Sequence, residues 1–452
     1  MKIRKVTLSL LATFILLAGW QLFAILMDQP ELIPSLPRLI KTLGELSVSG
    51  TFYQSIAATV VRGMAGMVLS LFSALGVAWL FARYELLYEL FRPLLSLMRS
   101  VPVISFILLA LIFLNPESIP LMIAFLTMFP LLAENLTKGI KSLHPGFSVM
   151  ARQFHIKRFN SLSQIIYPQL KPFLYSGLAS AVGFGWRAII MGEVLSQCTF
   201  GIGSEMKRAQ NFIAVPELLA WTIVAILISF LFDKGISAIS GFTFGITFTS
   251  NNKMLPTGDN QWIQAQGIGY HYGIFDFTYT FQHGIIYGIT APSGTGKTTL
   301  LNLLGGVLPP ATGIVRYMHT IGVSHVFQEP ELLPHLTALE NVALPLSSLF
   351  THEKAIAIAK KNLCDMEMET FGHRYPHELS YGQQQRIAIA RALAFPSPVL
   401  LMDEPFKGLD KELCLRIMKC IGERQSVEKR IVLFTTHSQE ELDQLADEVI
   451  HL

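Results

Sequence analysis

Long uncharged stretches of apolar residues recur through the first half of the chain, and the first of them is Val6–Met27. It is 22 residues long and follows the basic residues Lys2, Arg4 and Lys5. About 20 apolar residues cross the hydrocarbon core of a bilayer as a helix, whereas the apolar region of a cleaved signal peptide is usually about 7–15 residues long. The stretch therefore favours a retained membrane span over a signal peptide.

Five further apolar stretches follow the first one. They are Ile56–Ala82, Val101–Leu114, Ser118–Ala133, Pro172–Leu195 and Leu218–Phe232. Three of them fall near or below the usual span length of about 17–25 residues, so any of those three could instead be a re-entrant or core helix. We predict an all-α membrane domain with six spans over residues 1–240.

Basic loops indicate how these spans are oriented. The loop between the fourth and fifth stretches has no acidic residue between Lys138 and Lys171, and it also contains Lys141, Arg152, Lys157 and Arg158. Cytoplasmic loops carry such an excess of Lys and Arg. Because the N-terminus is also basic, we expect both ends of the membrane domain to face the cytoplasm.

Three charged residues lie inside the apolar stretches. Arg187 and Glu193 share one stretch, where a lone charge is costly, and this marks each of them for a functional or a pairing role unless it lies near the headgroups. Six residues turn a helix by about 600°, so the two side chains do not share a face and cannot simply neutralise each other. Arg62 lies near the start of its stretch and is expected to snorkel to an interface.

Composition narrows the classes of function. The 452 residues are 51% hydrophobic and only 15% charged, which excludes intrinsic disorder. Residues 1–240 hold 19 Lys and Arg against 11 Asp and Glu, a net +8, and the rest hold 16 against 21, a net −5. A total of +3 spread over this length offers no concentrated basic face, so no nucleic-acid partner is predicted. The four cysteines have no C-x-x-C spacing and are interpreted as free thiols.

Residues 241–265 separate the two halves of the chain. They mix Ser, Thr, Gly and Asn without a sustained period, which predicts a flexible linker. Beyond them, residues 266–452 form the second predicted domain.

A glycine-rich loop that follows an apolar stretch predicts a phosphate site. The loop reads Ala291-Pro-Ser-Gly-Thr-Gly-Lys-Thr298 and departs from G-x-x-x-x-G-K-[ST] only at Ala291. An alanine there would be strained only if its φ were positive, and Pro292 pushes it toward extended geometry. Backbone amides of such a loop bind phosphate oxygens, a lysine adds positive charge, and the Thr hydroxyl is placed for Mg²⁺. The predicted nucleotide-binding residues of the loop are Ser293, Gly294, Thr295, Gly296, Lys297, Thr298 and Thr299.

An apolar run, Val399–Met402, ends in two acids, Asp403 and Glu404. This is the pattern of a buried parallel strand that delivers carboxylates to a site at its C-terminal end. We expect Asp403 to hold Mg²⁺ through water and Glu404 to orient or deprotonate an attacking water.

Before that run, Ser380 is placed to be the N-cap of a helix. The exposed amides of such a helix can bind an anion, and Arg386 and Arg391 are expected to supply positive charge along it.

Five short motifs follow one another in the second half. In chain order they are Val-Phe-Gln328-Glu-Pro, Leu379-Ser-Tyr-Gly-Gln383, Met-Asp403-Glu404-Pro, Gly408-Leu-Asp410 and Thr-Thr-His437. Together they resemble the Q-loop, signature, Walker B, D-loop and switch histidine of an ABC ATPase. The resemblance implies an α/β P-loop ABC ATPase domain over residues 266–452, with ATP and Mg²⁺ as its ligands.

The same resemblance implies roles for individual residues. Glu404, His437 and Gln328 would be catalytic, and Gln328 would also sense the Mg²⁺ ion and relay to the membrane domain.

The signature residues Ser380 and Gly382, with Gln383 beside them, would bind the γ-phosphate of a nucleotide held by a partner's phosphate loop. Tyr272 resembles the aromatic residue that stacks on adenine, and Tyr270 is the alternative.

The basic loop of the membrane half carries a weaker pattern. Val149-Met-Ala151-Arg-Gln-Phe-His155, with Ile165-Ile-Tyr-Pro168 after it, has the spacing of the EAA loop of bacterial ABC importer permeases, E-A-A-x3-G-x9-I-x-L-P. Val149 replaces the Glu and His155 replaces the Gly. In that family the loop forms a coupling helix that docks into the ATPase. For this loop alone, an ordinary basic segment on anionic lipid is the alternative.

The order of segments around the loop is similar to that of permeases of the nitrate, taurine, alkanesulfonate and thiamine-precursor group. The segments are Arg99-Ser-Val-Pro-Val, Trp186–Leu195 and Gly201-Ile-Gly-Ser.

A fused permease and ATPase is therefore predicted, working as an importer of a small solute in a bacterial inner membrane with the ATPase in the cytoplasm. An organic anion or a thiamine-precursor-like compound falls within the resemblance. A P-loop domain of this kind lacks a closed, dry site until a second one supplies its signature helix, so a homodimer, or a heterodimer with a related half-transporter, is expected. An extracellular or periplasmic solute-binding protein is the other implied partner. The alternatives are an ABC exporter and a membrane-tethered regulatory ATPase without a solute path.

Overall fold

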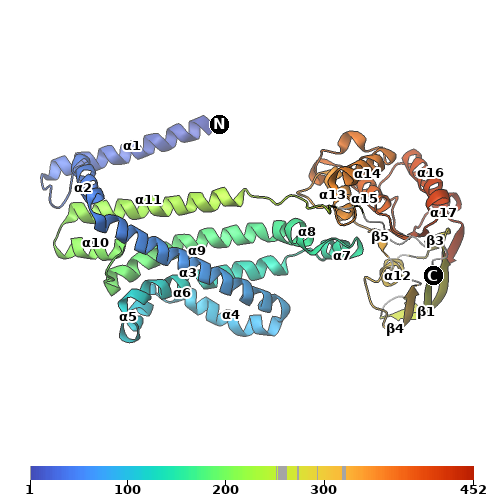
Figure 1. Ribbon diagram of the computed structural model, residues 1–452, viewed down its shortest axis with the longest axis horizontal. Coiled ribbons are helices and arrows are strands. Elements are labelled where there is room, and N and C mark those ends of the chain that lie inside the picture. Colours follow the sequence, from blue (N-terminus) through green and yellow to red (C-terminus); the bar gives the residue numbers. More distant parts are fainter. Residues whose placement is uncertain (1, 251, 253–261, 272–273, 293, 318–321) are drawn as a thin grey trace. The chain divides into compact units, whose positions relative to one another are not determined.

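The computed structural model describes residues 2–250, 252, 262–271, 274–292, 294–317 and 322–452, and the chain forms two compact units (Figure 1). The first unit comprises Met1–Leu143 and Gln169–Phe242. The second comprises His144–Pro168 and Thr243–Leu452. A segment of 25 residues from within the membrane half thus belongs to the compact unit of the ATPase half.

The first unit is helical. Its elements are α1 Lys2–Met27, α2 Leu36–Val48, α3 Gly50–Arg83, α4 Glu85–Ser100, α5 Val103–Phe113, the short 3₁₀ helix η1 Pro116–Ser118, α6 Ile119–Lys141, α9 Tyr167–Ser196, α10 Ile202–Asn211 and α11 Val215–Ser240. Within the described residues, four segments are long and apolar enough to cross a membrane: Gly50–Arg83, Pro116–Lys141, Arg158–Ser196 and Val215–Ser240.

Two further parts of this unit bear on the number of spans. Helices α4 and α5 meet at 94° and count as a fifth span if the bent pair is taken as one. Leu11–Met27 in α1 is a shorter apolar helix. The unit is therefore a helical, permease-like region with four or five spanning helices, and the count of six stays a prediction.

Small side chains explain how closely α3 packs against α6. Gly66, Ser70, Ala74 and Ala78 recur every fourth residue of α3 and are all buried. A Cβ atom added to Gly66 would lie 2.5 Å from the Cβ of Ala124 on α6. Small residues at this spacing let two helix backbones approach closely, which is how helices gain packing contacts inside a membrane.

The second unit is built on two sheets. The antiparallel one has the strand order β2 (Ile274–Gln282), β1 (Trp262–Tyr270) and β4 (Thr312–Tyr317). The parallel one has the order β5 (Val323–Val326), β6 (Val399–Asp403), β7 (Ile431–Thr435), β3 (Ile286–Thr290) and β8 (Glu448–His451). All residues of β6 and β7 are buried, as expected of parallel strands that are covered on both faces.

Helices complete this unit. They are α7 Pro145–Gln153, α8 Arg158–Asn160, η2 Ser161–Ile166, α12 Lys297–Leu304, α13 Ala338–Leu346, α14 His352–Asp365, η3 Glu369–Phe371, η4 Pro376–Glu378, α15 Tyr381–Ala394, α16 Lys411–Glu428 and α17 Gln439–Leu445. Phe154, which follows α7, is fully buried and meets the ring of Phe395 edge to face at 5.4 Å. The segment His144–Pro168 is thus part of the ATPase core.

The end of α7 explains one departure from the EAA pattern. His155 stands where that pattern has Gly, and its φ is +48°, in the left-handed region that glycine adopts without strain. The next amide, that of Ile156, donates to the carbonyl of Ala151 at 2.9 Å and closes the helix. The backbone thus has the turn that the missing glycine would favour.

Candidate active site

The phosphate loop connects β3 to α12. Gly294 and Gly296 have φ values of +84° and +101°, and Gly296 is the N-cap of α12, so the loop needs glycine at both positions. Thr295 donates through Oγ1 to the carbonyl of Pro292 at 2.8 Å. Ala291 is not among the described residues with a positive φ, so its methyl group causes no backbone strain. Ser293 lies outside the described residues.

Lys297 begins α12 and folds over the loop. Its side chain is only 6% exposed, and Nζ donates to the carbonyl of Ala291 at 2.8 Å. Nζ also lies 3.1 Å from Nε2 of His437. The site therefore presents a lysine cation, the left-handed glycines and the amides of a helix N-terminus together, which fits the phosphates of a nucleotide.

Oxygen atoms of Thr298 and Asp403 meet beside the loop. Thr298 Oγ1 donates to Asp403 Oδ2 at 2.6 Å, and Thr435 Oγ1 donates to Asp403 Oδ1 at 2.6 Å. The register of β6 and β7 pairs Asp403 with Thr435, which fixes this carboxylate while leaving it 2% exposed. A hydroxyl and a carboxylate are ligands that Mg²⁺ prefers, and Thr298 and Asp403 would hold the ion.

Glu404 follows β6 and faces the same site. Its amide donates to Thr435 Oγ1 at 3.0 Å, and its Oε1 lies 3.4 Å from Nε2 of His437. Its φ of +45° is unusual for a residue with a side chain, and such strain gathers at functional sites. Because the strand order is β6, β7, β3, the C-terminal ends of three neighbouring strands bring Glu404, His437 and Lys297 together.

The signature segment lies at the start of α15. Ser380 is its N-cap, as the sequence predicts: Ser380 Oγ accepts from the amide of Gln383, and Gln383 Oε1 accepts from the amide of Ser380 at 2.9 Å. A Cβ atom on Gly382 would lie 2.6 Å from the carbonyl oxygen of Gly408, so this position has room only for glycine.

The sequence reasoning missed a contact of Tyr381. This residue stands where the signature motif has its first Gly, and its hydroxyl donates to the carbonyl of Gln328 at 2.9 Å. It joins the signature segment to the Q-loop within one chain. The side chain of Gln328 is exposed and, among the described residues, makes no hydrogen bond to Thr298 or Asp403.

The guanidinium groups of Arg386 and Arg391, expected to supply positive charge along α15, both donate to backbone carbonyls. Arg391 is buried and donates to the backbone carbonyls of Pro330 and Glu331 at 2.8 and 2.6 Å, and burial lowers its pKa to about 10. Arg386 donates to the carbonyl of Met366 at 3.1 Å. Both guanidinium groups hold neighbouring loops in place, because their donors are used by backbone carbonyls.

The aromatic residues proposed for adenine are only partly described. Tyr272 lies outside the described residues. Tyr270 ends β1, with its ring 5.6 Å from that of His271. Thr299 lies within α12, one residue after Thr298.

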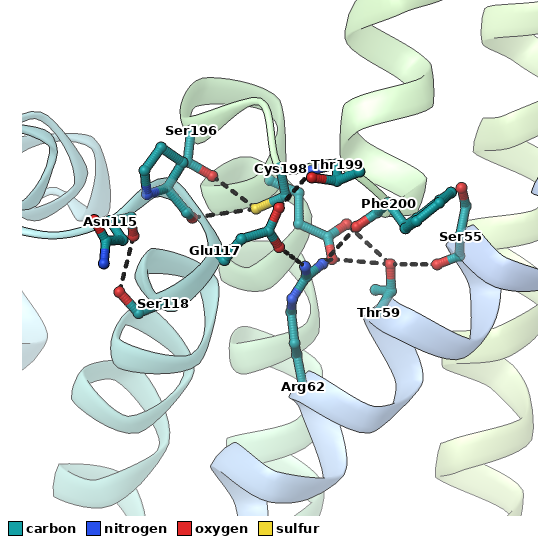
Figure 2. A network of polar contacts seen from close by, with 12 residues as sticks. Ser55, Thr59, Arg62, Asn115, Glu117, Ser118, Ser196, Cys198, Thr199 and Phe200 are labelled. Carbon is teal, nitrogen blue, oxygen red and sulfur yellow. Dashed lines mark hydrogen bonds and ion pairs between the residues drawn. The ribbon is translucent and has the colours of Figure 1, made fainter.

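A polar network joins α3, η1, α9 and the loop before α10 in the first unit, and Arg62 on α3 is at its centre (Figure 2). The Arg62 guanidinium donates to Glu193 Oε1 at 2.9 Å, to Glu117 Oε2 at 2.5 Å and to the carbonyl of Phe200 at 2.7 Å. Glu193 is fully buried and also accepts from Thr59 Oγ1 at 2.9 Å. Arg62 is therefore an ion-pairing residue, and its expected position at a membrane interface stays a prediction.

Two glycines make room for the buried carboxylate. A Cβ atom on Gly203 would lie 2.3 Å from the carbonyl oxygen of Ile190, and one on Gly201 would lie 2.6 Å from Cδ of Glu193. The amide of Gly203 donates to Glu193 Oε2 at 3.0 Å. The sequence Gly201-Ile-Gly-Ser is thus explained by the close approach of α10 to Glu193.

Arg187 differs from Arg62 in having no ion pair among the described residues. It is exposed and lines an open groove of about 670 Å³ between α9, α10 and α11, together with Trp186, Met206, Thr222, Ser229 and Asp233. A cation is costly on a surface that faces lipid, so Arg187 is expected to face water or another molecule.

Family comparisons divide the chain in the same way. Residues 66–241 match the model of the binding-protein-dependent transport system inner membrane component, and residues 274–407 match the ABC transporter model. A dimeric bacterial ABC transporter cassette of known structure is 30% identical, covers 42% of this chain and 94% of its own, and aligns with a TM-score of 0.39.

Curated relatives match the ATPase half. The thiamine import ATP-binding protein of Shigella flexneri is 37% identical over 207 residues, which are 43% of this chain and 85% of that protein. The probable sulfate/thiosulfate import ATP-binding protein of Chlorella vulgaris is 36% identical over 185 residues, 38% of this chain and 77% of that protein. The Fe(3+) ions import ATP-binding protein of Brucella abortus is 40% identical over 181 residues, 38% of this chain and 51% of that protein.

The phosphate loop, the paired acids, the signature helix and the preceding permease-like helices thus agree with both family models. The chain belongs to the ABC transporter family, as an importer in which the membrane permease and the nucleotide-binding ATP hydrolase are one polypeptide.

Proposed function

We propose that two copies of this chain, or one copy and a related half-transporter, import a small solute across a bacterial inner membrane. The proposed division is a permease over residues 1–240, a linker over 241–265 and a cytoplasmic ATPase over 266–452. Six spans result if Leu11–Met27 crosses the membrane and the bent pair α4 and α5 counts as one.

The observation that carries the proposal is the convergence of Lys297, Glu404 and His437 beside Thr298 and Asp403. Lys297 and the loop amides bind the phosphates. Thr298 and Asp403 would hold Mg²⁺, which would neutralise charge on the phosphate oxygens. Glu404 orients the attacking water and accepts its proton, and His437 contacts the γ-phosphate.

Residues of the partner complete the reaction site in this proposal. Ser380, Gly382 and Gln383 stand at the N-terminus of α15, where amides are available for the γ-phosphate of a nucleotide bound to the other copy. Gln328 senses the γ-phosphate and the Mg²⁺ of the nucleotide bound to its own chain, and its carbonyl accepts a hydrogen bond from Tyr381 of the signature segment. An enclosed site between two copies keeps bulk water away, which strengthens the electrostatic interactions with the phosphate.

The proposed solute is an organic anion or a thiamine-precursor-like compound delivered by an extracellular or periplasmic binding protein. Arg187 supports the proposal of an anionic solute. It is an exposed cation within a membrane span, and no ion pair neutralises it among the described residues.

The test of the ATPase assignment is ATP hydrolysis by the purified protein in nanodiscs. We expect Glu404→Gln to keep ATP binding and to lower kcat by about 10²- to 10⁴-fold, since a general base contributes that much. Glu412→Gln, an exposed glutamate in the first turn of α16, is the matched control and should keep the wild-type rate. Equal hydrolysis by Glu404→Gln and wild type would remove Glu404 from the mechanism. Loss of hydrolysis in wild type, with ATP still bound, would mean that another subunit is required.

A further inference from the structure

Residues 243–250, which follow α11, are bound to neighbouring parts of the second unit. Residues 243–250, which we call the strap, belong to the same compact unit as His144–Pro168, which we call the coupling segment. The strap lies against the coupling segment on one side and against the end of α13 on the other, and one asparagine makes both connections.

That asparagine is Asn160, the last residue of α8. Its Oδ1 accepts from the amide of Thr247 at 3.0 Å and from Thr247 Oγ1 at 2.6 Å. Its Nδ2 donates to the carbonyl of Thr247 at 2.8 Å and to Ser347 Oγ at 2.8 Å. An amide side chain has two N–H donors and one oxygen with two lone pairs, so all four of its hydrogen bonds are made, in a side chain that is 0% exposed.

Neighbouring contacts repeat the same bridge. Gln164 Nε2 donates to the carbonyl of Phe244 at 2.9 Å, and the rings of Tyr167 and Phe244 pack at 5.1 Å. On the ATPase side, the amide of Thr249 donates to the carbonyl of Ser347 at 3.0 Å. The strap is thus hydrogen-bonded to the coupling segment and to the ATPase at the same time.

On its other face, the coupling segment contacts α12, the helix that follows the phosphate loop. Gln153 Nε2 donates to the carbonyl of Gly305, the C-cap of α12, at 2.8 Å. Phe154 lies 5.5 Å under the guanidinium of Arg391, which holds the carbonyl of Glu331 next to the Q-loop. The coupling segment therefore lies between nucleotide-responsive elements and the strap.

We propose that the strap is a clamp through which the coupling segment moves with the ATPase of its own chain. Asn160 is the positioning residue of this clamp, because its side chain bonds the coupling segment, to which it belongs, to both the strap and the end of α13. When the ATPase moves on ATP binding, α12 on one face of the coupling segment and the strap on the other face move the segment, and the segment moves the permease. The inference rests on the proposed function, in which ATP binding rearranges the permease.

Hydrogen–deuterium exchange of the full chain in nanodiscs tests the clamp without a known solute. The parent is Glu404→Gln, measured with and without Mg²⁺ and ATP, and the variant adds Asn160→Ala. We expect exchange at the amide of Thr247 to rise roughly tenfold in the variant. The change in amide exchange that ATP causes in α12 should remain in the variant. The change in amide exchange that ATP causes in α9 should be lost. In the wild-type background, Asn160→Ala should hydrolyse ATP within about twofold of the normal rate, since Asn160 is remote from the catalytic groups.

Two further variants keep the outcome unambiguous. Asn211→Ala, at the exposed end of α10, is the matched asparagine control and should change none of these quantities. Ser347→Ala removes one of the four hydrogen bonds of Asn160. It should reproduce the loss of the α9 response to a smaller degree, and it decides the question if Asn160→Ala does not fold. The clamp is overturned if the ATP-dependent exchange in α9 is unchanged in both variants. It is also overturned if the rate of ATP hydrolysis falls in parallel with the α9 response. If the parent itself shows no α9 response to ATP, the proposed function fails instead.

Discussion

Two glycines on one helix offer a sharp test of how the first unit packs. A Cβ atom on Gly66 would lie 2.5 Å from the Cβ of Ala124, whereas one on Gly76 would meet nothing within 4 Å. Carbon atoms pack best at about 3.5–4.0 Å, so Gly66→Ala must push α3 and α6 apart by about 1 Å. Overpacking of this kind costs about 1–3 kcal/mol. Gly→Ala also improves helix propensity by about 1 kcal/mol, but this gain is common to both variants.

The difference between Gly66→Ala and Gly76→Ala therefore isolates the steric cost. We expect the unfolding free energy of Gly66→Ala to be lower than that of Gly76→Ala by about 1–3 kcal/mol. Unfolding by SDS in mixed micelles, followed by tryptophan fluorescence, measures this difference for the full chain. Equal stabilities, or a more stable Gly66→Ala, would refute the close packing of α3 on α6.

Three further predictions concern the second unit. His155→Gly should raise the unfolding free energy by about 0.5–1 kcal/mol in a denaturant titration, because His155 has a φ of +48°; no gain would mean that its side chain compensates for the strain. Burial, and then the charge of Arg391, lower the pKa of His325 to about 3. The unfolded chain therefore takes up a proton there below pH ~6.5 and the folded chain does not, so stability is lost as the pH falls from 7.5 to 5, by about 2 kcal/mol. His325→Phe should lack this loss, and denaturant titrations at both pH values check it; identical pH dependence would show that His325 is charged when folded. Tyr381→Phe should lower kcat for ATP hydrolysis by about two- to tenfold without changing ATP affinity, because it removes only the hydrogen bond to Gln328; a changed affinity would contradict this.

Most of the phosphate site could be predicted because its residues are neighbours in the sequence. Gly294, Gly296 and Lys297 are neighbours in the chain, and their loop conformation follows from their own residue types. Asp403 could be anticipated because it ends an apolar run, which is typical of a buried strand. His437 was found only through the resemblance to a family, because its approach to Lys297 depends on the order of the parallel strands.

Contacts between distant residues could not be predicted in this way. The sequence marked Glu193 as costly inside a membrane, but its partner Arg62 lies 131 residues earlier on another helix. The four bonds of Asn160 depend in the same way on which segments pack together, and nothing in the spacing of Asn160 and Thr247 indicates it. A signal for the network was present in Gly201 and Gly203, since closely spaced glycines mark a close approach of backbone.

The inclusion of His144–Pro168 in the ATPase unit has a consequence for synthesis of the protein. Translation runs from the N-terminus at about 5–20 residues per second, and 227 residues separate Pro168 from Phe395, whose ring packs on Phe154 (395 − 168 = 227). The segment therefore leaves the ribosome roughly 10–45 s before the ring that covers Phe154. During that interval the apolar side chains of Met150 and Phe154, both buried in the finished fold, have no surface to cover them. A nascent chain paused between these two points should be the form most in need of chaperones.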